Sequence, residues 1–567
     1  MRSLLALLIL LFCASPACAD RFAAISLHDV VDDESKLGAD DINTAQLTAF
    51  FDWLKGNGWS TITFDDIEAA RAGQRPLPAK AILLTFDDGY VSIYSRVYPL
   101  LQAYHFHAVF FLVGTWVDAP PNGTVHYGDE IVPRSRFVSW EHAREMQASG
   151  LAEFGSHSYD LHRVIVGNPQ GSKMGAAATW AYDSRTGRYE TDAALAARVH
   201  ADLERSVALM RRQLGRAPRA LAWPFGRYSG PALLGARQAG FRYVLNLTPE
   251  PADTRNASQP MEIPRLYPSQ NPNLATIIGL LRFTRPDPEQ RRVVCLGLDH
   301  IAGGTPEEGN SALGRTIEDI RRLGANIAVL DPIAARGADG SIQSVWFRSA
   351  LLPVKKDILS FAAWQIDRRA GANVYLRVDL KAAAASVGAS RVPDMVREII
   401  RVAPIEGVVL DPPGIFLQGG TAPTAWYPWV VRAERDALHV TDAPDRLALD
   451  AWRAAEIERP GSSLGIVAPP QLPGAWPAPA ADLVLVTPSS DGTVSAARGF
   501  ADKGWLKPDG SSRLALPLPV NDPDEAMQDM REAQVLGAAA FAFCPATVLP
   551  NPKVSAVFSS ARFPWLP

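Results

Sequence analysis

The sequence predicts an α/β protein made of two consecutive barrels, a (β/α)7-type barrel followed by a (β/α)8 barrel of the TIM type. Short apolar runs that suit strands alternate with helical patterns along most of the 567 residues, and this order predicts parallel sheets. A polar, proline-containing stretch at 284–290 separates the alternation into two series. The second series spans about 275 residues with eight strand candidates, which is the usual size of a TIM barrel. We therefore expect one domain at 20–283, a linker at 284–290 and a second domain at 291–567.

Composition narrows the function classes. Apolar residues make up 47% of the chain and charged residues 20%, which is ordinary for a globular protein and argues against a disordered, collagen-like or coiled-coil chain. The formal net charge is −4 at pH 7. Because a nucleic-acid-binding domain is normally basic, we expect no nucleic-acid partner.

Residues 1–19 have the features of a secretory signal peptide. Arg2 gives a positive start, and the apolar run Leu4–Phe12 is too short to span a bilayer, which takes about 20 residues. A small-residue cleavage site ends at Ala19. A lipid anchor at Cys13 or Cys18 is the competing interpretation, but neither cysteine follows a lipobox sequence. We expect export across the inner membrane to the periplasm, with or without attachment to the outer membrane.

Seven apolar runs of the first series are strand candidates. They are Phe22–Leu27, Trp59–Phe64, Ala81–Phe86, Val109–Val113, Leu151–Gly155, Ala220–Trp223 and Tyr243–Leu247. Apolar residues at helical spacing between 47 and 54 predict a helix with Thr44 as its N-cap, and a second helix is predicted at about 192–214. Residues 167–190 lack periodicity, which predicts a long insertion loop.

Eight apolar runs of the second series are strand candidates. They are Val293–Leu298, Asn326–Leu330, Asn373–Val378, Gly407–Leu410, Leu464–Val467, Leu483–Val486, Arg513–Leu518 and Ala538–Phe543. Helical patterns at 316–323 and 393–402 lie between them. Cys295 and Cys544 sit within apolar runs, so we expect buried thiols, with a bridge between them as the alternative.

Acidic and histidine residues follow two strands of the first series. Asp87 and Asp88 come directly after one apolar strand, and His157 and His162 follow another, five residues apart. Adjacent carboxylates at a buried strand end are costly unless they bind a cation or take part in proton chemistry. A DD-G motif alone is often a turn, and two such histidines alone are usually unrelated. Together, one aspartate and two histidines predict a facial site for a divalent metal, with the second aspartate as a base.

Several segments of the chain resemble a known family. The TFDDG motif at 85–89, the His157 and His162 pair and the WPFG motif at 223–226 resemble the polysaccharide deacetylases of carbohydrate esterase family four. Three further segments are similar to the poly-β-1,6-N-acetylglucosamine N-deacetylases of biofilm export systems. They are Ser26–Val30, Ile263–Arg265 and, in the second half, 345–375. The resemblance therefore covers both halves of the chain.

The resemblance implies roles for these acidic and histidine residues. Asp88, His157 and His162 would hold one divalent metal ion, for which zinc, nickel, cobalt and iron(II) all suit this donor set. Asp87 would be the general base that takes a proton from the attacking water, and His28 would protonate the leaving amine.

Two positions qualify that expectation. His28 has a structural alternative as a strand-end histidine hydrogen-bonded to Asp29. The family at large carries an arginine that orients the base where this chain has Ala222. This departure predicts a less well oriented Asp87 and low turnover.

The resemblance also implies a substrate site. A backbone N–H near Tyr90 would stabilise the oxyanion. Trp223, Pro224 and Phe225 would wall the sugar site, with buried packing as the alternative for the aromatic rings.

Four strand candidates of the second series are followed by, or end near, an aspartate. These residues are Asp299, Asp331, Asp379 and Asp411. At the carboxyl ends of barrel strands they could serve glycoside cleavage or attract a cationic polymer, or each could be a cap or an ion-pair partner. The related biofilm proteins have a second barrel that binds, and in some cases cleaves, the polymer, and its fourth strand ends in His-Asp-Asp. Here two prolines follow Asp411, so we expect a binding or degenerate barrel, with glycosidase activity as the alternative.

The leading hypothesis is an exported, metal-dependent N-deacetylase of poly-β-1,6-N-acetylglucosamine whose second barrel guides the polymer, with an outer-membrane export porin as a partner. The same chemistry on chitin oligomers or peptidoglycan is a second hypothesis. A non-catalytic polysaccharide-binding export factor is a third. An iron(II) oxygenase would use the same donor set, but the βα order argues against its usual jelly-roll fold.

Overall fold

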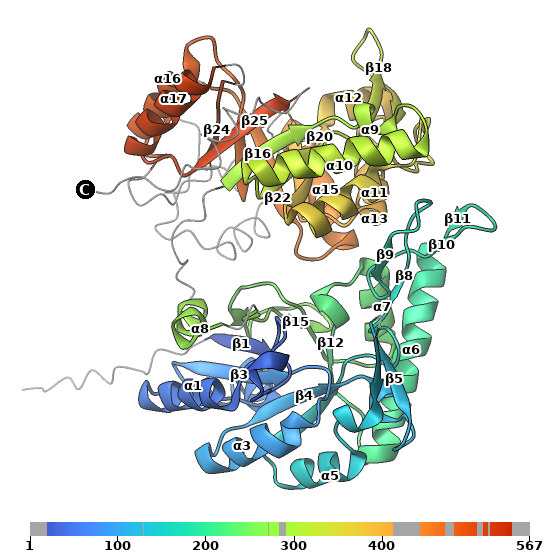
Figure 1. The fold of residues 1–567 in the computed structure, drawn as a ribbon, viewed down its shortest axis with the longest axis vertical. Coiled ribbons are helices and arrows are strands. Elements are labelled where there is room, and N and C mark those ends of the chain that lie inside the picture. Colours follow the sequence, from blue (N-terminus) through green and yellow to red (C-terminus); the bar gives the residue numbers. More distant parts are fainter. Residues whose placement is uncertain are drawn as a thin grey trace, which may run out of the picture. The chain divides into compact units, whose positions relative to one another are not determined.

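The computed structural model describes residues 20–128, 130–269, 272–282, 291–411, 443–470, 481–506, 514–519 and 522–546 (Figure 1). The predicted signal peptide and the linker at 284–290 lie outside these residues. The chain divides into two compact units. The first consists of Met1–Asp160, Asp202–Gly226 and Ala236–Thr284, and the second of Leu161–Ala201, Arg227–Gly235 and Arg285–Pro567. No helix in the described ranges combines the length and the apolar character that a membrane crossing needs.

The first unit contains a nearly closed parallel barrel. Its parallel strands, in order around the sheet, are β1 (Arg21–Leu27), β3 (Ala81–Phe86), β4 (Ala108–Leu112), β7 (Ala152–Ser156), β12 (Ala220–Ala222), β13 (Tyr243–Leu245) and β15 (Met261–Ile263). A bridge between Ile25 and Leu266 brings the chain after β15 back to β1. Two short strands flank this path, β14 (Ala252–Asp253) against β1 and β2 (Ser60–Thr61) against β3. The predicted (β/α)7-type barrel is therefore confirmed.

One predicted strand of this barrel is replaced by another. The run 59–64 forms only the two-residue β2, because Thr63 caps α2 (Phe64–Arg71) by accepting a hydrogen bond from the amide of Asp66. The seventh parallel strand is β15, which the prediction lacked. Three residues between two prolines give too short an apolar run to be recognised as a strand.

The two helices predicted for the first half are present as α1 and α6, and the structure adds further α-helices among the described residues. Their bounds are α1 (Thr44–Gly56), α3 (Tyr98–Tyr104), α4 (Gly114–Val117), α5 (Trp140–Ala148), α6 (Asp192–Leu214), α7 (Gly230–Gln238) and α8 (Leu274–Leu281). The N-cap of α1 is Asn43 rather than Thr44, because Asn43 and Gln46 form a reciprocal capping box. A hairpin of β5 (Thr124–Tyr127) and β6 (Glu130–Pro133) lies between α4 and α5.

The insertion predicted at 167–190 is not a plain loop. It contains two short hairpins, β8 (Val164–Val166) with β9 (Lys173–Gly175) and β10 (Tyr182–Asp183) with β11 (Arg188–Tyr189). These residues group with the second unit. Within that unit the Tyr189 hydroxyl donates a hydrogen bond to the Asp357 carboxylate at 2.7 Å.

The second unit contains a closed barrel of eight parallel strands, as predicted. They are β16 (Arg291–Leu296), β17 (Ile327–Leu330), β20 (Asn373–Asp379), β21 (Gly407–Asp411), β22 (Ser463–Ala468), β23 (Leu483–Val486), β24 (Leu514–Pro517) and β25 (Ala540–Ala546). The described helices are α9 (Asp299–Ala302), α10 (Pro306–Leu323), α11 (Leu359–Gln365), α12 (Leu380–Val387), α13 (Val392–Val402), α15 (Ala443–Glu458), α16 (Gly492–Asp502) and α17 (Pro523–Val535). A hairpin of β18 (Ile333–Arg336) and β19 (Ile342–Val345) follows β17.

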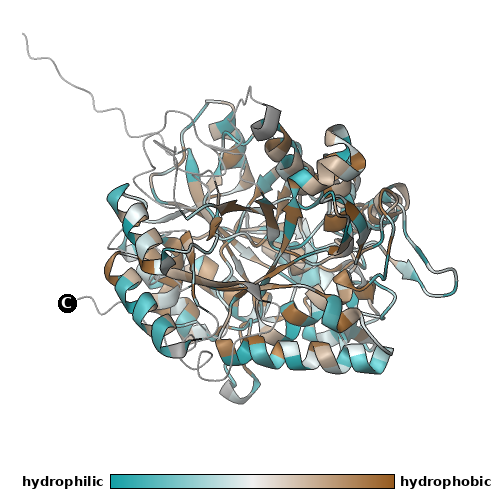
Figure 2. Cartoon of the chain, turned by 90° about the horizontal axis from the view of Figure 1, so that it is seen from above, coloured by the Kyte–Doolittle hydropathy of each residue, from teal (hydrophilic) through white to brown (hydrophobic). Residues whose placement is uncertain are grey.

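Alternating strand residues build two hydrophobic layers of this barrel. Val293, Val329, Val409 and Leu485 belong to the cluster inside the barrel, whereas their strand neighbours pack in a larger cluster with the helices. In Figure 2 the strands are mostly brown, and the helices carry both teal and brown residues. Burial on both faces explains why most of these strands are nearly continuous apolar runs.

Cys295 and Cys544 form a disulfide, so the expectation of two free thiols is wrong. The two residues are 249 apart in sequence, which hides their proximity. Closure of the barrel pairs β16 with β25 and brings their Cα atoms to 4.9 Å, within the normal range for a disulfide.

Candidate metal centre and active site

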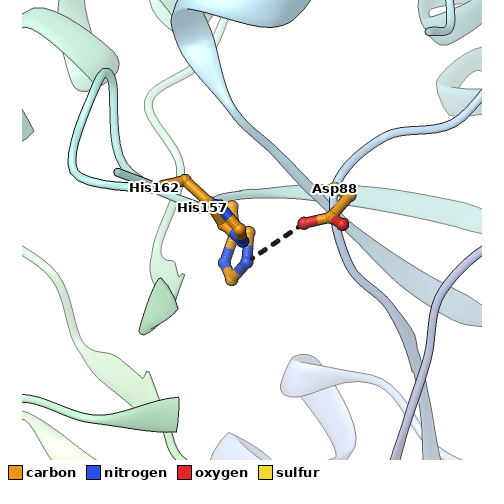
Figure 3. Close-up of side chains that lie close together, drawn as sticks. All are labelled: Asp88, His157 and His162. Carbon is orange, nitrogen blue, oxygen red and sulfur yellow. Dashed lines mark ion pairs between the residues drawn. The ribbon is translucent and has the colours of Figure 1, made fainter. Parts of the chain in front are cut away.

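The predicted metal ligands converge at the carboxyl ends of two strands of the first barrel. Asp88 follows β3, and His157 follows β7. One ligand atom from each of Asp88, His157 and His162 lies within 4.8 Å of the other two. Figure 3 shows both imidazole rings on the side of the Asp88 carboxylate. The two motifs, distant in sequence, therefore meet in one cluster.

The backbone turns tightly at Asp88 and Gly89, and the adjacent carboxylates of Asp87 and Asp88 contact different neighbours. Asp88 and Gly89 both have left-handed backbones, with φ of 72° and 78°. A Cβ atom on Gly89 would lie 2.7 Å from Cδ2 of Leu112, so this position requires glycine for space as well as for conformation. Strained backbone at a non-glycine residue such as Asp88 is typical of functional sites.

The geometry of His157 suits a metal ligand. Its Nδ1 lies 2.8 Å from the carbonyl oxygen of Ala222, so Nδ1 carries the proton in the neutral ring. Its Nε2 then presents a lone pair toward Oδ1 of Asp88, 3.4 Å away. Two electron-pair donors facing one another in a buried site are relieved by a shared cation, so the residues present fit a divalent metal ion. Burial opposes a charge on His157, but the carboxylates of Asp87 and Asp88 outweigh it and raise the pKa of the ring.

Asp87 is paired with a buried arginine. Arg265 Nη1 donates to Oδ1 of Asp87 at 2.7 Å, and Nη2 donates to Oδ2 at 2.8 Å. The hydroxyl of Ser26 donates to Oδ2 at 3.1 Å. Burial raises the pKa of Asp87, but the charge and hydrogen bonds of Arg265, together with the charges of His157 and His28, outweigh burial and lower that pKa to about 2. The carboxylate is therefore ionised at neutral pH and held in one orientation.

This pair overturns the expectation of a poorly oriented base. Ala222 does stand where the family arginine would be, but Arg265, which follows β15, supplies a guanidinium from another strand. Its Nη1 is also 2.9 Å from Oγ1 of Thr85, and its Nε donates to the carbonyl of Asn246 at 3.2 Å. The Ile-Pro-Arg segment was recognised in the sequence as a shared motif, but its partner could not be read from local spacing.

His28 lies at the end of β1, and its partner is not Asp29. The Asp29 carboxylate accepts hydrogen bonds from the hydroxyl of Ser92 at 2.6 Å and from the amide of Val30 at 2.9 Å. The His28 ring packs edge-on against Tyr267, with centroids 5.5 Å apart. Among the described residues, its buried Nδ1 has no hydrogen-bond partner. The role of His28 as an acid stays a prediction.

The predicted substrate residues differ in exposure. Tyr90 is buried, and its hydroxyl is 2.6 Å from that of Tyr127. Burial and the charge of Asp88 raise the pKa of Tyr90, which keeps the hydroxyl protonated. Trp223 and Pro224 are buried, which agrees with the packing alternative, whereas Phe225 is 47% exposed. Their contact with substrate stays a prediction.

Tyr127 and Tyr267 were missed by sequence reasoning. Tyr127 lies on the β5–β6 hairpin, and Tyr267 follows β15. Burial and then the charge of Asp88 raise the pKa of Tyr127. Burial, the hydrogen bond and charge of Asp40 and, after them, the charge of Asp88 raise the pKa of Tyr267. Neither tyrosine belongs to a motif, so only the folded chain reveals that they surround the site.

The aspartates of the second barrel are largely engaged in structural contacts. Asp379 caps α12 by accepting the amide of Ala382 at 2.9 Å and pairs with Arg336 at 2.6 Å. Asp411 accepts hydrogen bonds from Arg377, one of them at 3.1 Å. The cap and ion-pair alternatives of the sequence therefore describe these two residues.

A cavity of about 510 Å³ opens within the second barrel. Asp299, Asp331 and Arg377 line it together with the Cys295–Cys544 disulfide. Burial raises the pKa of Asp331, against the lowering effect of the amide of Ile333. The cavity brings together two of the four predicted aspartates, Asp299 and Asp331.

Profiles of known families match parts of both barrels. A family profile described as polysaccharide deacetylase matches residues 74–244, and a second, described as hypothetical glycosyl hydrolase family 13, matches residues 295–398. Residues 74–244 form a polysaccharide deacetylase domain. This segment includes the predicted ligands and base, whereas His28 and Arg265 lie outside it.

Individual relatives are similar to parts of this chain. The chain is 34% identical over 354 residues to the poly-beta-1,6-N-acetyl-D-glucosamine N-deacetylase of Escherichia coli K12, covering 62% of this chain and 52% of that protein. The chain thus spans about half the length of this curated relative. A solved de-N-acetylase from Aggregatibacter actinomycetemcomitans is 33% identical, with a TM-score of 0.43, over 46% of this chain and 100% of its own. The deacetylase domain of BpsB from Bordetella bronchiseptica is 36% identical, with a TM-score of 0.39, over 43% and 95%.

Proposed function

We propose that this chain is an exported, metal-dependent enzyme that hydrolyses N-acetyl groups from poly-β-1,6-N-acetylglucosamine. The observation that carries the proposal is the Asp88, His157 and His162 cluster beside an ionised Asp87 within a polysaccharide deacetylase domain. The printed name of the Escherichia coli relative supports the choice of polymer. Zinc, nickel, cobalt and iron(II) all suit the donor set.

A divalent ion held by these three residues would polarise the amide carbonyl and make water a better nucleophile. The chain's own residues supply the proton transfers. Asp87 offers about four lone-pair sites, and Arg265 and Ser26 use three of them, which leaves Oδ1 with the fewest partners. Oδ1 of Asp87 is therefore the atom that accepts the proton of the attacking water. His28, from the end of β1, would donate a proton to the leaving amine.

We assign polymer binding to the second barrel. Deacetylation turns neutral sugars into cationic glucosamine units, and Asp299 and Asp331 present carboxyl groups to the cavity of the barrel. Arg377 holds Asp411, and Arg336 holds Asp379, so these two carboxylates serve the barrel's own structure. This arrangement supports binding ahead of glycoside cleavage.

The N-terminal sequence supports a periplasmic location for this enzyme. The signal features of 1–19 favour export across the inner membrane, and an outer-membrane porin that exports the polymer is a suitable partner. Appearance of the processed chain in a periplasmic fraction tests this part of the proposal.

Acetate release from defined oligomers tests the function. The wild type should release acetate from β-1,6-linked N-acetylglucosamine oligomers faster than from β-1,4-linked ones or from peptidoglycan fragments. Asp87→Asn should bind the oligomers and release no acetate above background. Faster release from β-1,4 oligomers would contradict the choice of polymer. Binding without acetate release by the wild type would favour a non-catalytic export factor.

A further inference from the structure

The loop that joins the two histidine ligands is held by backbone hydrogen bonds rather than by regular structure. The amide of His157 donates to the carbonyl of Leu112 at 2.8 Å, and the amide of Ser158 donates to the hydroxyl of Ser156 at 3.0 Å. Ser158 has a left-handed backbone with φ of 73°. The chain turns sharply at this residue. The carbonyls of Ser158 and Tyr159 accept hydrogen bonds from the amides of Gly114 and Thr115 at 3.0 and 2.9 Å, and the position of His162 relative to His157 depends in addition on what holds the next two amides.

Those two amides share one acceptor on helix α6. The amide of Tyr159 donates to Oδ1 of Asp202 at 2.9 Å, and the amide of Asp160 donates to Oδ2 of the same carboxylate at 2.8 Å. The side chain is buried, and hydrogen bonds to a charged acceptor are about twice as strong as neutral ones. One turn further along α6, the Ser206 hydroxyl lies 2.7 Å from that of Ser156. A single face of α6 therefore fixes both ends of the turn.

We propose that Asp202 is a positioning residue that sets the spacing of the two histidine ligands. It acts through the backbone of the turn. This inference rests on the proposed metal site. Its sequence signal is weak, because Asp202 lies forty residues beyond His162 within a helical pattern that carries no motif.

The variants follow from the geometry. Asp202→Asn replaces one carboxylate oxygen by an NH2 group. It keeps one acceptor oxygen, and the new NH2 donor faces a backbone N–H donor of the loop. Asp202→Ala removes both acceptors. Glu204→Gln is the matched control, since Glu204 lies on the same helix with an exposed side chain. Loss of a partner that orients metal ligands typically weakens metal binding about 10- to 100-fold.

Metal affinity of the purified full chain is the decisive readout, measured with Zn²⁺ and Co²⁺ against a chromophoric chelator. We expect binding about 10-fold weaker in Asp202→Asn, up to about 100-fold weaker in Asp202→Ala and unchanged in Glu204→Gln. With excess metal, the acetate-release rate of Asp202→Asn should recover while KM for the oligomer stays at the wild-type value. If Asp202→Ala does not fold, Asp202→Asn decides the question.

The outcomes separate this inference from the function on which it rests. A wild type that binds no ion, or a His162→Ala variant that binds as the wild type does, removes the proposed metal site itself. A wild type that binds tightly together with an Asp202→Asn variant of equal affinity overturns the role of Asp202 alone. A raised KM at every metal concentration would show that Asp202 acts on substrate rather than on ligand spacing.

Discussion

Replacing Arg265 by methionine should raise the pKa of the base and remove the partner that orients it. Arg265 is completely buried, and its two Nη atoms hold the two oxygens of the Asp87 carboxylate. Methionine keeps an unbranched apolar stem and removes the charge and all the donors of the guanidinium group. Arg255→Met is the matched control, because Arg255 makes the same two-point contact with Asp253 while its side chain is 64% exposed.

The size of the effect follows from burial. Leaving one member of a buried ion pair without its partner costs about 3–5 kcal/mol of unfolding free energy, whereas an exposed pair contributes about 0–1 kcal/mol. Two charge-assisted hydrogen bonds at about 1.5 kcal/mol or more each correspond to at least about 2 pH units in the pKa of Asp87. The pKa of Asp87 is lowered from 3.8 to about 2, so its stabilising contribution exists above the unfolded value and disappears as the pH falls toward 2. The Arg265→Met variant should lack that contribution. The low-pH side of its kcat/KM profile should move to higher pH.

Two measurements test this reasoning. Urea unfolding at pH 7 should show a loss of about 3 kcal/mol or more for Arg265→Met and less than about 1 kcal/mol for Arg255→Met. Acetate release between pH 4 and 9 should show this shift of the low-pH side in Arg265→Met alone. If the two variants are equally stable and Arg265→Met keeps the wild-type pH profile, Arg265 does not govern the base.

Three other predictions concern single features. Gly89→Ala should weaken metal binding measured by chelator competition, because φ of 78° and a 2.7 Å approach to Leu112 leave no room for a methyl group; unchanged affinity would contradict this. Asp331→Asn should gain stability relative to the wild type as the pH rises from 4 to 7 in urea unfolding, since burial raises the pKa of Asp331 and makes its ionised form costly. A variant that is less stable at pH 7 would show that the ion pair of Asp331 with Arg336, at 3.6 Å, dominates. Reduction of the Cys295–Cys544 disulfide, which closes a separation of 249 residues, should destabilise the second barrel by about 5 kcal/mol in the chain-entropy account, and an unfolding midpoint unaffected by reductant would refute it.

Much of the architecture was predictable because parallel barrel strands are buried on both faces. All eight strand candidates of the second series coincide with strands of the closed barrel, since most of them are nearly continuous apolar runs bounded by polar residues. The prediction failed where a segment was too short or where a local cap competed with a strand. Met261–Ile263 is a barrel strand of three residues, and Thr63 starts a helix inside an expected strand.

The candidate site was predictable to the extent that its residues lie in local motifs. Asp87, Asp88, His157 and His162 occur in two short segments whose strand ends predict their meeting. Arg265, by contrast, lies 178 positions from Asp87, and its pairing depends on the closure of the barrel rather than on spacing. The disulfide, which the sequence offers only as the alternative to buried thiols, depends on barrel closure for the same reason.

The central claim is that the Asp88, His157 and His162 cluster holds a metal ion that this chain needs for deacetylation. Acetate release from β-1,6-linked N-acetylglucosamine oligomers, measured before chelation, after chelation and after return of each candidate metal, tests it most directly. The account predicts release that chelation abolishes and that at least one of zinc, nickel, cobalt or iron(II) restores, with no restoration in His162→Ala. Release that survives complete metal removal, or no release with any of the four metals, would contradict it.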